Sequence, residues 1–291
     1  MTYDDDPSDE LILRPMSPDE VEELVAWAAQ EGWNPGRSDA RLFYETDPEG
    51  FVAAEIDGEM IGGGAVVAYG ETYGFMGLFI VKPEYRGRGL GRHLWTARRD
   101  MLRARLDPEA PIGMDGVEAM APFYAEGGFE LAYVNRRYSL TAGAQTVSSD
   151  VVPISDVPFQ QLVKFDRHFF PAFREEFLDG WITQRGAVAR AVVNDAGVQG
   201  YAVARPCGEG YKVGPLFAED AETASTLLHA IENELVGETL FVDIPDVNPE
   251  HEAFAARHGM EEVFRCARMY HGEPPAIDES RVFGITTFEL G

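Results

Sequence analysis

The stretch that decides the fold is residues 81–94, which read Val81-Lys82-Pro83-Glu84-Tyr85-Arg86-Gly87-Arg88-Gly89-Leu90-Gly91-Arg92-His93-Leu94. An apolar run, Tyr73–Val81, precedes it and predicts a buried strand, and a helical pattern follows it to about Arg105. The three alternating glycines adopt backbone angles that other residues avoid and leave no Cβ to block a ligand. Backbone N–H groups in such a turn, at the positive end of the next helix, favour an anion.

The charge of this loop favours a diphosphate. Arg86, Arg88 and Arg92 form a local basic patch in a chain with 50 acidic and 24 basic residues, and guanidinium groups match phosphate geometry. The spacing Gly-x-Gly-x-Gly differs from the Gly-x-Gly-x-x-Gly of dinucleotide-binding folds. The loop also lacks the Gly-Lys-Ser/Thr ending of a nucleotide P-loop.

The full pattern, Val-x-Pro-x-Tyr-Arg-Gly-x-Gly-x-Gly after an apolar strand, resembles the GCN5-related N-acetyltransferase (GNAT) family. The resemblance implies that acetyl-CoA is the donor, with its pyrophosphate on the loop. It also implies that its pantetheine arm pairs with the preceding strand as an added strand would. The predicted donor contacts are Phe79, Ile80, Val81, Arg86, Gly87, Arg88, Gly89, Leu90, Gly91 and Arg92.

A second segment, Ala121–Phe129, resembles the family's helix that ends in Tyr-x-x-x-Gly-Phe. The resemblance implies that Tyr124 gives a proton to the departing CoA thiolate, which suits a phenol that is protonated at neutral pH. The alternative is that Tyr124 only packs against its helix. Val117 stands where many family members have an asparagine, which removes one pantetheine contact.

Transfer to an amine also requires a base, because only the neutral amine attacks. Glu71, before the donor strand, and Asp115, at the end of the next predicted strand, are the candidates, and the alternative for each is a solvated carboxylate. Trp33 and Asn34, between the first two predicted helices, are expected to line the acceptor pocket. An equally simple interpretation of this pair is that it ends the preceding helix.

The order of predicted elements, β, α, β, β, β, α, β, α, β, occurs twice along the chain. It predicts an α/β (α+β) protein of two tandem GNAT-like modules, each with a central mixed sheet flanked by helices. Residues 1–141 form the first module, 142–150 a linker, and 151–291 the second module. Within the second module, Phe159–Trp181 is expected to be mostly helical.

The second module resembles a YitH/HsdE-like acetyltransferase domain but lacks the donor motif. Residues 219–224, Glu-Asp-Ala-Glu-Thr-Ala, stand where the first module has Arg86–Gly91, and Ala255 takes the place of Tyr124. Each acid would repel a phosphate by ~1 kcal/mol at 4 Å even in water. The module is therefore interpreted as a degenerate copy that shapes the acceptor cleft or an interface, or that serves only as a structural support.

Composition excludes several other classes. A net charge of −26 argues against nucleic-acid and membrane partners, because both require a cationic surface. No apolar run reaches the ~20 residues of a membrane span. The acidic start Met1–Asp6 is unlike a secretion signal. A cytoplasmic protein is therefore expected. With only three lysines and dispersed acids, we predict adaptation to molar salt, where the Debye length falls to ~3 Å.

Cysteine and histidine spacing predicts no disulfide framework and no metal. Cys207 and Cys266 are interpreted as small buried side chains, and no third ligand follows His251 and His258 at a metal-site spacing.

The favoured hypothesis is an N-acetyltransferase that acts on the primary amine of a small or amino-acid-like acceptor. A non-catalytic acyl-CoA sensor and a protein or peptide N-acetyltransferase are the alternatives. The sequence leaves a homo-oligomer possible.

Overall fold

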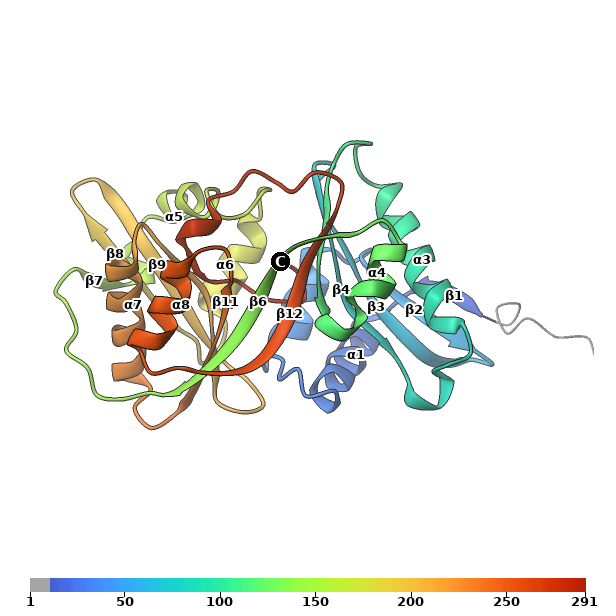
Figure 1. Ribbon diagram of the computed structural model, residues 1–291, viewed down its shortest axis with the longest axis horizontal. Helices are drawn as coiled ribbons and strands as arrows, with labels where there is room; N and C mark the ends of the chain where they lie inside the picture. The colour runs from blue at the N-terminus through green and yellow to red at the C-terminus, as the bar shows by residue number, and fades with distance from the viewer. Residues whose placement is uncertain (1–10) are drawn as a thin grey trace, which may run out of the picture.

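One mixed sheet runs through both halves of the molecule, and helices flank it (Figure 1). The computed structural model describes residues 11–291, so the acidic stretch Met1–Asp6 lies outside the described residues. The strand order is β1-β2-β3-β4-β5-β12-β6-β11-β10-β9-β8-β7, and β13 pairs with β10 off this path. The pairs β4–β5 and β10–β11 are parallel, and the other pairs are antiparallel. The predicted mixed α/β class is confirmed.

The first half contains the elements that surround the glycine-rich loop. They are β1 (Ile12–Pro15), α1 (Pro18–Gln30), α2 (Asp39–Thr46), β2 (Phe51–Ile56), β3 (Glu59–Tyr69), β4 (Tyr73–Val81), α3 (Leu90–Arg103), β5 (Ile112–Val117), α4 (Ala121–Glu126) and β6 (Glu130–Thr141). Helix α1 begins with a capping box, because Ser17 and Glu20 each bond the other's backbone N–H.

The second half repeats this order. Its elements are β7 (Val151–Pro153), α5 (Phe159–Asp166), α6 (Glu175–Thr183), β8 (Val188–Asn194), β9 (Gly197–Pro206), β10 (Tyr211–Ala218), α7 (Ala221–Glu234), β11 (Thr239–Pro245), α8 (Pro249–Arg257), β12 (Glu261–His271) and β13 (Val282–Gly284).

The predicted helix over Phe159–Trp181 is two helices, α5 and α6. Pro171 lies in the break between them, where its ring and missing N–H oppose a continuous helix. A buried ion pair fixes the connection: the Arg174 guanidinium donates to the Asp166 carboxylate at 2.8 and 2.6 Å.

The last strands of the two halves change places. Strand β12, from the second half, pairs with β5, and β6, from the first half, pairs with β11. The two strands also pair with each other and cross between the halves side by side (Figure 1). The two expected mixed sheets are thus joined edge to edge, and each is completed by the other segment's final strand.

Three apolar clusters hold the helices on the sheet. Helices α1, α2, α5 and α6 contribute to one cluster, in which Phe43 and Trp181 stack with ring centroids 6.3 Å apart across the two halves. A second cluster contains residues of α3 and α4, and a third contains residues of α7 and α8. The first cluster makes the two halves one packed body.

Candidate active site

A cavity opens where β4 and β5 separate. The two strands pair only over Gly74–Met76 and Ile112–Met114, and beyond that point the described part of β4 pairs with β3 alone. A register shift in the β3–β4 ladder and a positive φ of 51° at Leu78 mark the same place. The cavity has a volume of about 490 Å³. One edge of β4 is therefore free to accept an extended ligand, as in strand addition.

Arg98 of α3 holds this distortion of β4. The guanidinium is fully buried, and its Nη2 donates to the Ala65 and Gly77 carbonyls at 2.5 and 2.7 Å. A Cβ at Gly64 would lie 2.2 Å from Arg98 Cζ, so any larger residue here would displace the guanidinium. No carboxylate among the described residues pairs with Arg98, and burial lowers the pKa of Arg98 to about 9.

The glycine-rich loop forms one end of the cavity. Gly87 and Gly89 have φ of 75° and 83°, in the left-handed region that glycine tolerates. Gly89 is the N-cap of α3, and no side chain caps the first turn. The first N–H groups of α3 therefore remain available to an anion.

Two of the three predicted arginines line the cavity. Arg86 donates to the Val81 carbonyl at 2.7 Å and pairs with Glu31 at 2.5 Å, and Arg92 pairs with Glu126 at 2.8 Å. Arg88 is exposed and lies over the Tyr85 ring, outside the cavity lining. Of the other predicted donor contacts, Phe79, Ile80, Val81, Gly87 and Gly91 line the cavity, whereas Gly89 lies outside the lining and Leu90 is buried.

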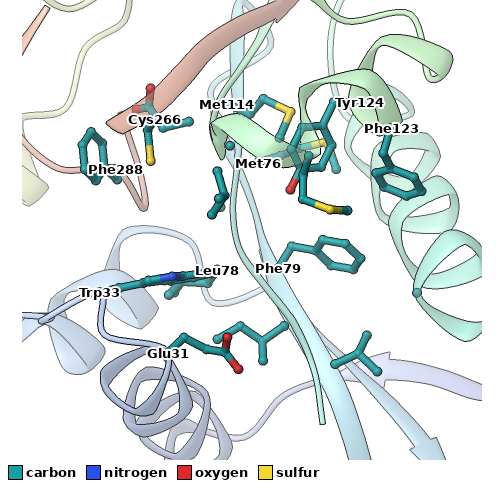
Figure 2. Close-up of a pocket in the computed structure, with 18 of the residues that line it drawn as sticks. Glu31, Trp33, Met76, Leu78, Phe79, Met114, Phe123, Tyr124, Cys266 and Phe288 are labelled. Atoms are coloured by element: carbon teal, nitrogen blue, oxygen red, sulfur yellow. The ribbon is translucent and has the colours of Figure 1, made fainter. Parts of the chain in front are cut away.

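Tyr124 reaches the cavity from α4, with its hydroxyl toward the open space (Figure 2). The ring packs against Trp95 and Phe123, and a Cβ at Gly116 would come within 2.3 Å of it. Burial raises the pKa of Tyr124 to about 12, with the nearby Arg98 charge opposing the shift. The phenol therefore carries its proton at neutral pH.

The two predicted bases lie in different surroundings. Glu71 is exposed in the turn before β4, outside the cavity lining, at the opposite end of β4 from the loop. Asp115 is at the cavity wall, but its carboxylate accepts from Arg268 at 2.8 and 2.6 Å and from Asn135 at 2.7 Å. Burial raises the pKa of Asp115, and Arg268 opposes this change. Both carboxylate oxygens of Asp115 thus already accept hydrogen bonds.

Trp33 lines the cavity, and Asn34 does not. The Trp33 carbonyl accepts from two buried cations, Arg137 at 3.1 Å and Lys212 at 3.0 Å. The Asn34 side chain instead exchanges two hydrogen bonds of 2.9 Å with the Glu209 backbone. Asn34 therefore fastens the loop to the second half, while Trp33 faces the ligand space.

One wall of the cavity comes from the end of the chain. Phe264 and Cys266 of β12, together with Phe288 and Glu289, line it, and Cys266 and Phe288 lie across the open space from Phe79 and Tyr124 (Figure 2). Burial raises the pKa of the Cys266 thiol well above its ordinary value, so this side chain acts as a small apolar group. Sequence reasoning allowed the second half to shape the acceptor cleft but named none of these residues, because only the long-range packing of β12 and the C-terminal segment brings them here.

The C-terminal segment packs closely on β4. The Leu290 side chain is fully buried, and the Tyr69 hydroxyl donates to the Leu290 carbonyl at 2.9 Å. A Cβ at Gly77 would lie 1.9 Å from the Glu289 carbonyl oxygen. Glu289 itself is 3 % exposed, and its carboxylate accepts from Thr287.

At the corresponding place in the second half, the chain itself fills the space. Asp220 caps α7 by accepting from the Thr223 N–H at 2.8 Å, and Glu219 pairs with Arg281. The C-terminal segment crosses β10 so closely that a Cβ at Gly214 would lie 2.4 Å from the Ile285 carbonyl oxygen. The helix N-terminus and the strand edge that a second donor would need are both occupied.

The fold and the site define a GNAT-type acyltransferase with two GNAT domains, and the chain belongs to this family. Residues 19–129 match the family described as "Acetyltransferase (GNAT) family", and residues 162–284 match the "Acetyltransferase (GNAT) domain". The resemblance found in the loop and in the repeated order of elements is therefore confirmed. Among the described residues, every helix is too short or too polar to cross a membrane.

The chain is 27% identical over 287 residues to holothin acyltransferase from Pseudoalteromonas sp. (strain SANK 73390), a match that covers 96% of this chain and 94% of that protein. A putative acetyltransferase from Pyrococcus horikoshii has the same fold, with a TM-score of 0.83, 22% identity, and coverage of 100% of this chain and 99% of that one. A tandem GNAT protein from the clavulanic acid biosynthesis pathway aligns with a TM-score of 0.63 and 17% identity, over 91% of this chain and 100% of that one.

Proposed function

We propose that this protein transfers an acetyl or other short acyl group from acyl-CoA to the primary amine of a small molecule. One observation carries the proposal: the separation of β4 from β5 creates a single cavity between the uncapped N-terminus of α3 and the hydroxyl of Tyr124. The loop end suits a diphosphate, the free edge of β4 suits a pantetheine amide chain, and Tyr124 suits the thioester sulfur.

Tyr124 is the proposed general acid. The buried phenol donates its proton to the sulfur as the amine nitrogen bonds to the carbonyl carbon and the C–S bond breaks. Cys266, although it lines the cavity, holds its thiol proton, so a direct transfer fits better than an acyl-cysteine intermediate.

Glu289 is the proposed recipient of the amine proton, directly or through a water. It lines the cavity, as Phe264, Cys266 and Phe288 do, whereas Asp115 is paired with Arg268 and Glu71 lies outside the cavity. Glu289→Gln should lower kcat/KM for the acceptor at least about tenfold, while the Kd for the donor stays the same. Glu250→Gln, on the exposed face of α8, is the matched control. Equal kcat/KM in the Glu289 and Glu250 variants would remove Glu289 from the reaction.

The acceptor is proposed to be a small, flat, largely apolar amine. Trp33, Phe264 and Phe288 surround the acceptor end, and the C-terminal segment closes it against an extended peptide. The relative named holothin acyltransferase supports a small-molecule acceptor over a protein. Because one chain forms the whole cavity, the proposal requires no oligomer.

We also propose a cytoplasmic location in a halophilic organism. The net charge of −26 with three lysines supports it, because such a surface is tolerated best where salt screens self-repulsion.

The test is acetyl-CoA turnover in molar KCl with pooled acceptors, namely aromatic amines, amino acids, polyamines, aminoglycosides and short peptides. Free CoA is measured by chromatography. We expect turnover with small amines, a fall of at least about 100-fold in kcat for Tyr124→Phe, and no change for the control Tyr211→Phe. Acetyl-CoA binding without turnover of any pool would favour the acyl-CoA sensor instead.

A further inference from the structure

Three metal-ligating side chains meet in the second half, outside the active site. His229 and Glu232 lie three residues apart on one face of α7, and His258 is the C-cap of α8. Their ligand atoms all lie within 4.8 Å of one another. No hydrogen bond joins any two of the three within the described part of the chain. The three groups therefore surround a shared space without satisfying one another.

The charge of this cluster is uncompensated. Glu232 is 4 % exposed, and among the residues that the structure describes its carboxylate accepts from two neutral groups alone, the Gly143 N–H at 3.2 Å and the Gln145 amide at 3.3 Å. No ion pair of residues 11–291 includes Glu232. A buried carboxylate without a cation is costly, and a bound metal ion would supply the missing charge.

Ser225 contacts one member of this cluster. Its hydroxyl oxygen lies 2.9 Å from His258 Nε2 and 2.8 Å from the Ala221 carbonyl oxygen. A hydrogen bond from the ring nitrogen that does not bind the metal is the usual support of a ligating histidine.

Sequence spacing pointed to another pair, His251 with His258. Both ring nitrogens of His251 are taken, by the Pro245 carbonyl at 2.6 Å and the Ser280 carbonyl at 3.0 Å. The metal-free expectation rested on the lack of a third ligand at a metal-site spacing from this pair. The fold brings His229 and Glu232 to His258 instead.

We propose that His229, Glu232 and His258 bind one Zn²⁺ ion, with water as the fourth ligand. Two imidazoles and one carboxylate form a set that zinc accepts with bonds of about 2.1 Å, and such ligand atoms lie about 3.4 Å apart. The two partly exposed histidines close that gap by moving inward. Because Glu232 also holds Gly143 and Gln145, the ion ties α7 and α8 to the connection between the two halves.

The experiment uses the full chain, stripped with EDTA and titrated with Zn²⁺ by calorimetry in molar KCl. Co²⁺ serves as a spectroscopic probe, because its visible absorption distinguishes four-coordinate from six-coordinate sites. We expect one equivalent of Zn²⁺, a four-coordinate Co²⁺ spectrum, and a raised Tm with the ion. His229→Ala, His258→Ala and Glu232→Gln should each weaken binding at least about tenfold.

His168→Ala, at an exposed histidine of the same half, is the control and should bind Zn²⁺ as the parent does. Circular dichroism of each variant shows whether it is folded, and the histidine variants should be, because both rings are partly exposed. Absence of binding in the parent chain, or equal binding in the folded His229 and His168 variants, would overturn the proposal.

Discussion

Gly77→Ala should loosen the C-terminal segment from β4. The added Cβ would lie 1.9 Å from the Glu289 carbonyl oxygen and 2.8 Å from its carbonyl carbon, and both are backbone atoms that no rotamer change can move. The segment must therefore retreat by about 1 Å, and overpacking of this kind costs about 1–3 kcal/mol. The retreat also strains the hydrogen bond from Tyr69 to Leu290, worth about 1 kcal/mol. The expected loss in free energy of unfolding is about 2–4 kcal/mol.

Denaturant unfolding in molar KCl measures this loss as a shift of the midpoint at unchanged m. Gly91→Ala is the matched control, because its Cβ would meet only Phe79 and Val81 at 3.6 and 3.7 Å. Gly91 lies inside α3, so alanine there should leave stability unchanged or raise it by up to about 1 kcal/mol.

A chain lacking Glu289–Gly291 isolates the cause. If the clash is with Glu289, Gly77→Ala should cost less than about 1 kcal/mol in the shortened background, and the double-mutant cycle then yields a coupling of about 1–4 kcal/mol. An equal cost in both backgrounds would refute the reasoning, because the strain would then lie within β4 itself.

Three further predictions follow from the charges. Arg205→Met leaves the fully buried Asp39 without the guanidinium that lies 3.0 Å away, and should lower the free energy of unfolding by about 3–5 kcal/mol in a denaturant titration. Adding Asp39→Leu to the same chain should restore part of that loss, and a loss below about 1 kcal/mol for Arg205→Met alone would contradict the prediction. The pKa of Tyr124 is raised to about 12, so the contribution of its neutral phenol to the free energy of unfolding is complete below pH about 10 and declines as pH rises through 12. For the same reason, the pH profile of kcat should show no fall caused by Tyr124 below pH about 11. A fall in kcat near pH 10 that Tyr124→Phe removes would refute this. Lowering KCl from molar to millimolar concentrations should reduce the helical circular dichroism signal, and full stability in dilute buffer would exclude salt dependence.

The donor end of the site could be predicted because its determinants are local. A glycine-rich turn, its arginines and the helix that follows occupy one short segment, and their geometry depends mainly on that segment. Tyr124, which lines the same cavity, was singled out in the same way, since the helix and the glycines that position it are near in sequence. The break at Pro171 also had a local signal, which outweighs the apolar pattern around it.

The cavity wall that β12 and the C-terminal segment supply could not be predicted, because its determinants are long-range. A strand's alternation of apolar residues does not specify which of two equivalent sheet edges it joins, so β6 and β12 fit either half on local grounds. The pairing of Asp115 with Arg268 depends on that choice. Asp115 therefore resembled a free base in sequence, although the structure holds it in an ion pair.

The exchange of strands gives a physical reason for a second half that lacks a donor loop. Phe264 and Cys266 close the cavity of the first half, and Arg268 neutralises Asp115, whose side chain is fully buried. Without β12 the edge of β5 would be unpaired and the Asp115 charge would stand alone in the interior, an arrangement that costs several kcal/mol. Glu219 and Asp220, which stand where the first half has its arginine and glycines, lie at the start of α7, away from β12. The residue types at these two positions therefore do not affect the contacts of β12. The second half can therefore lose its own chemistry while its last strand remains necessary to the site of the first.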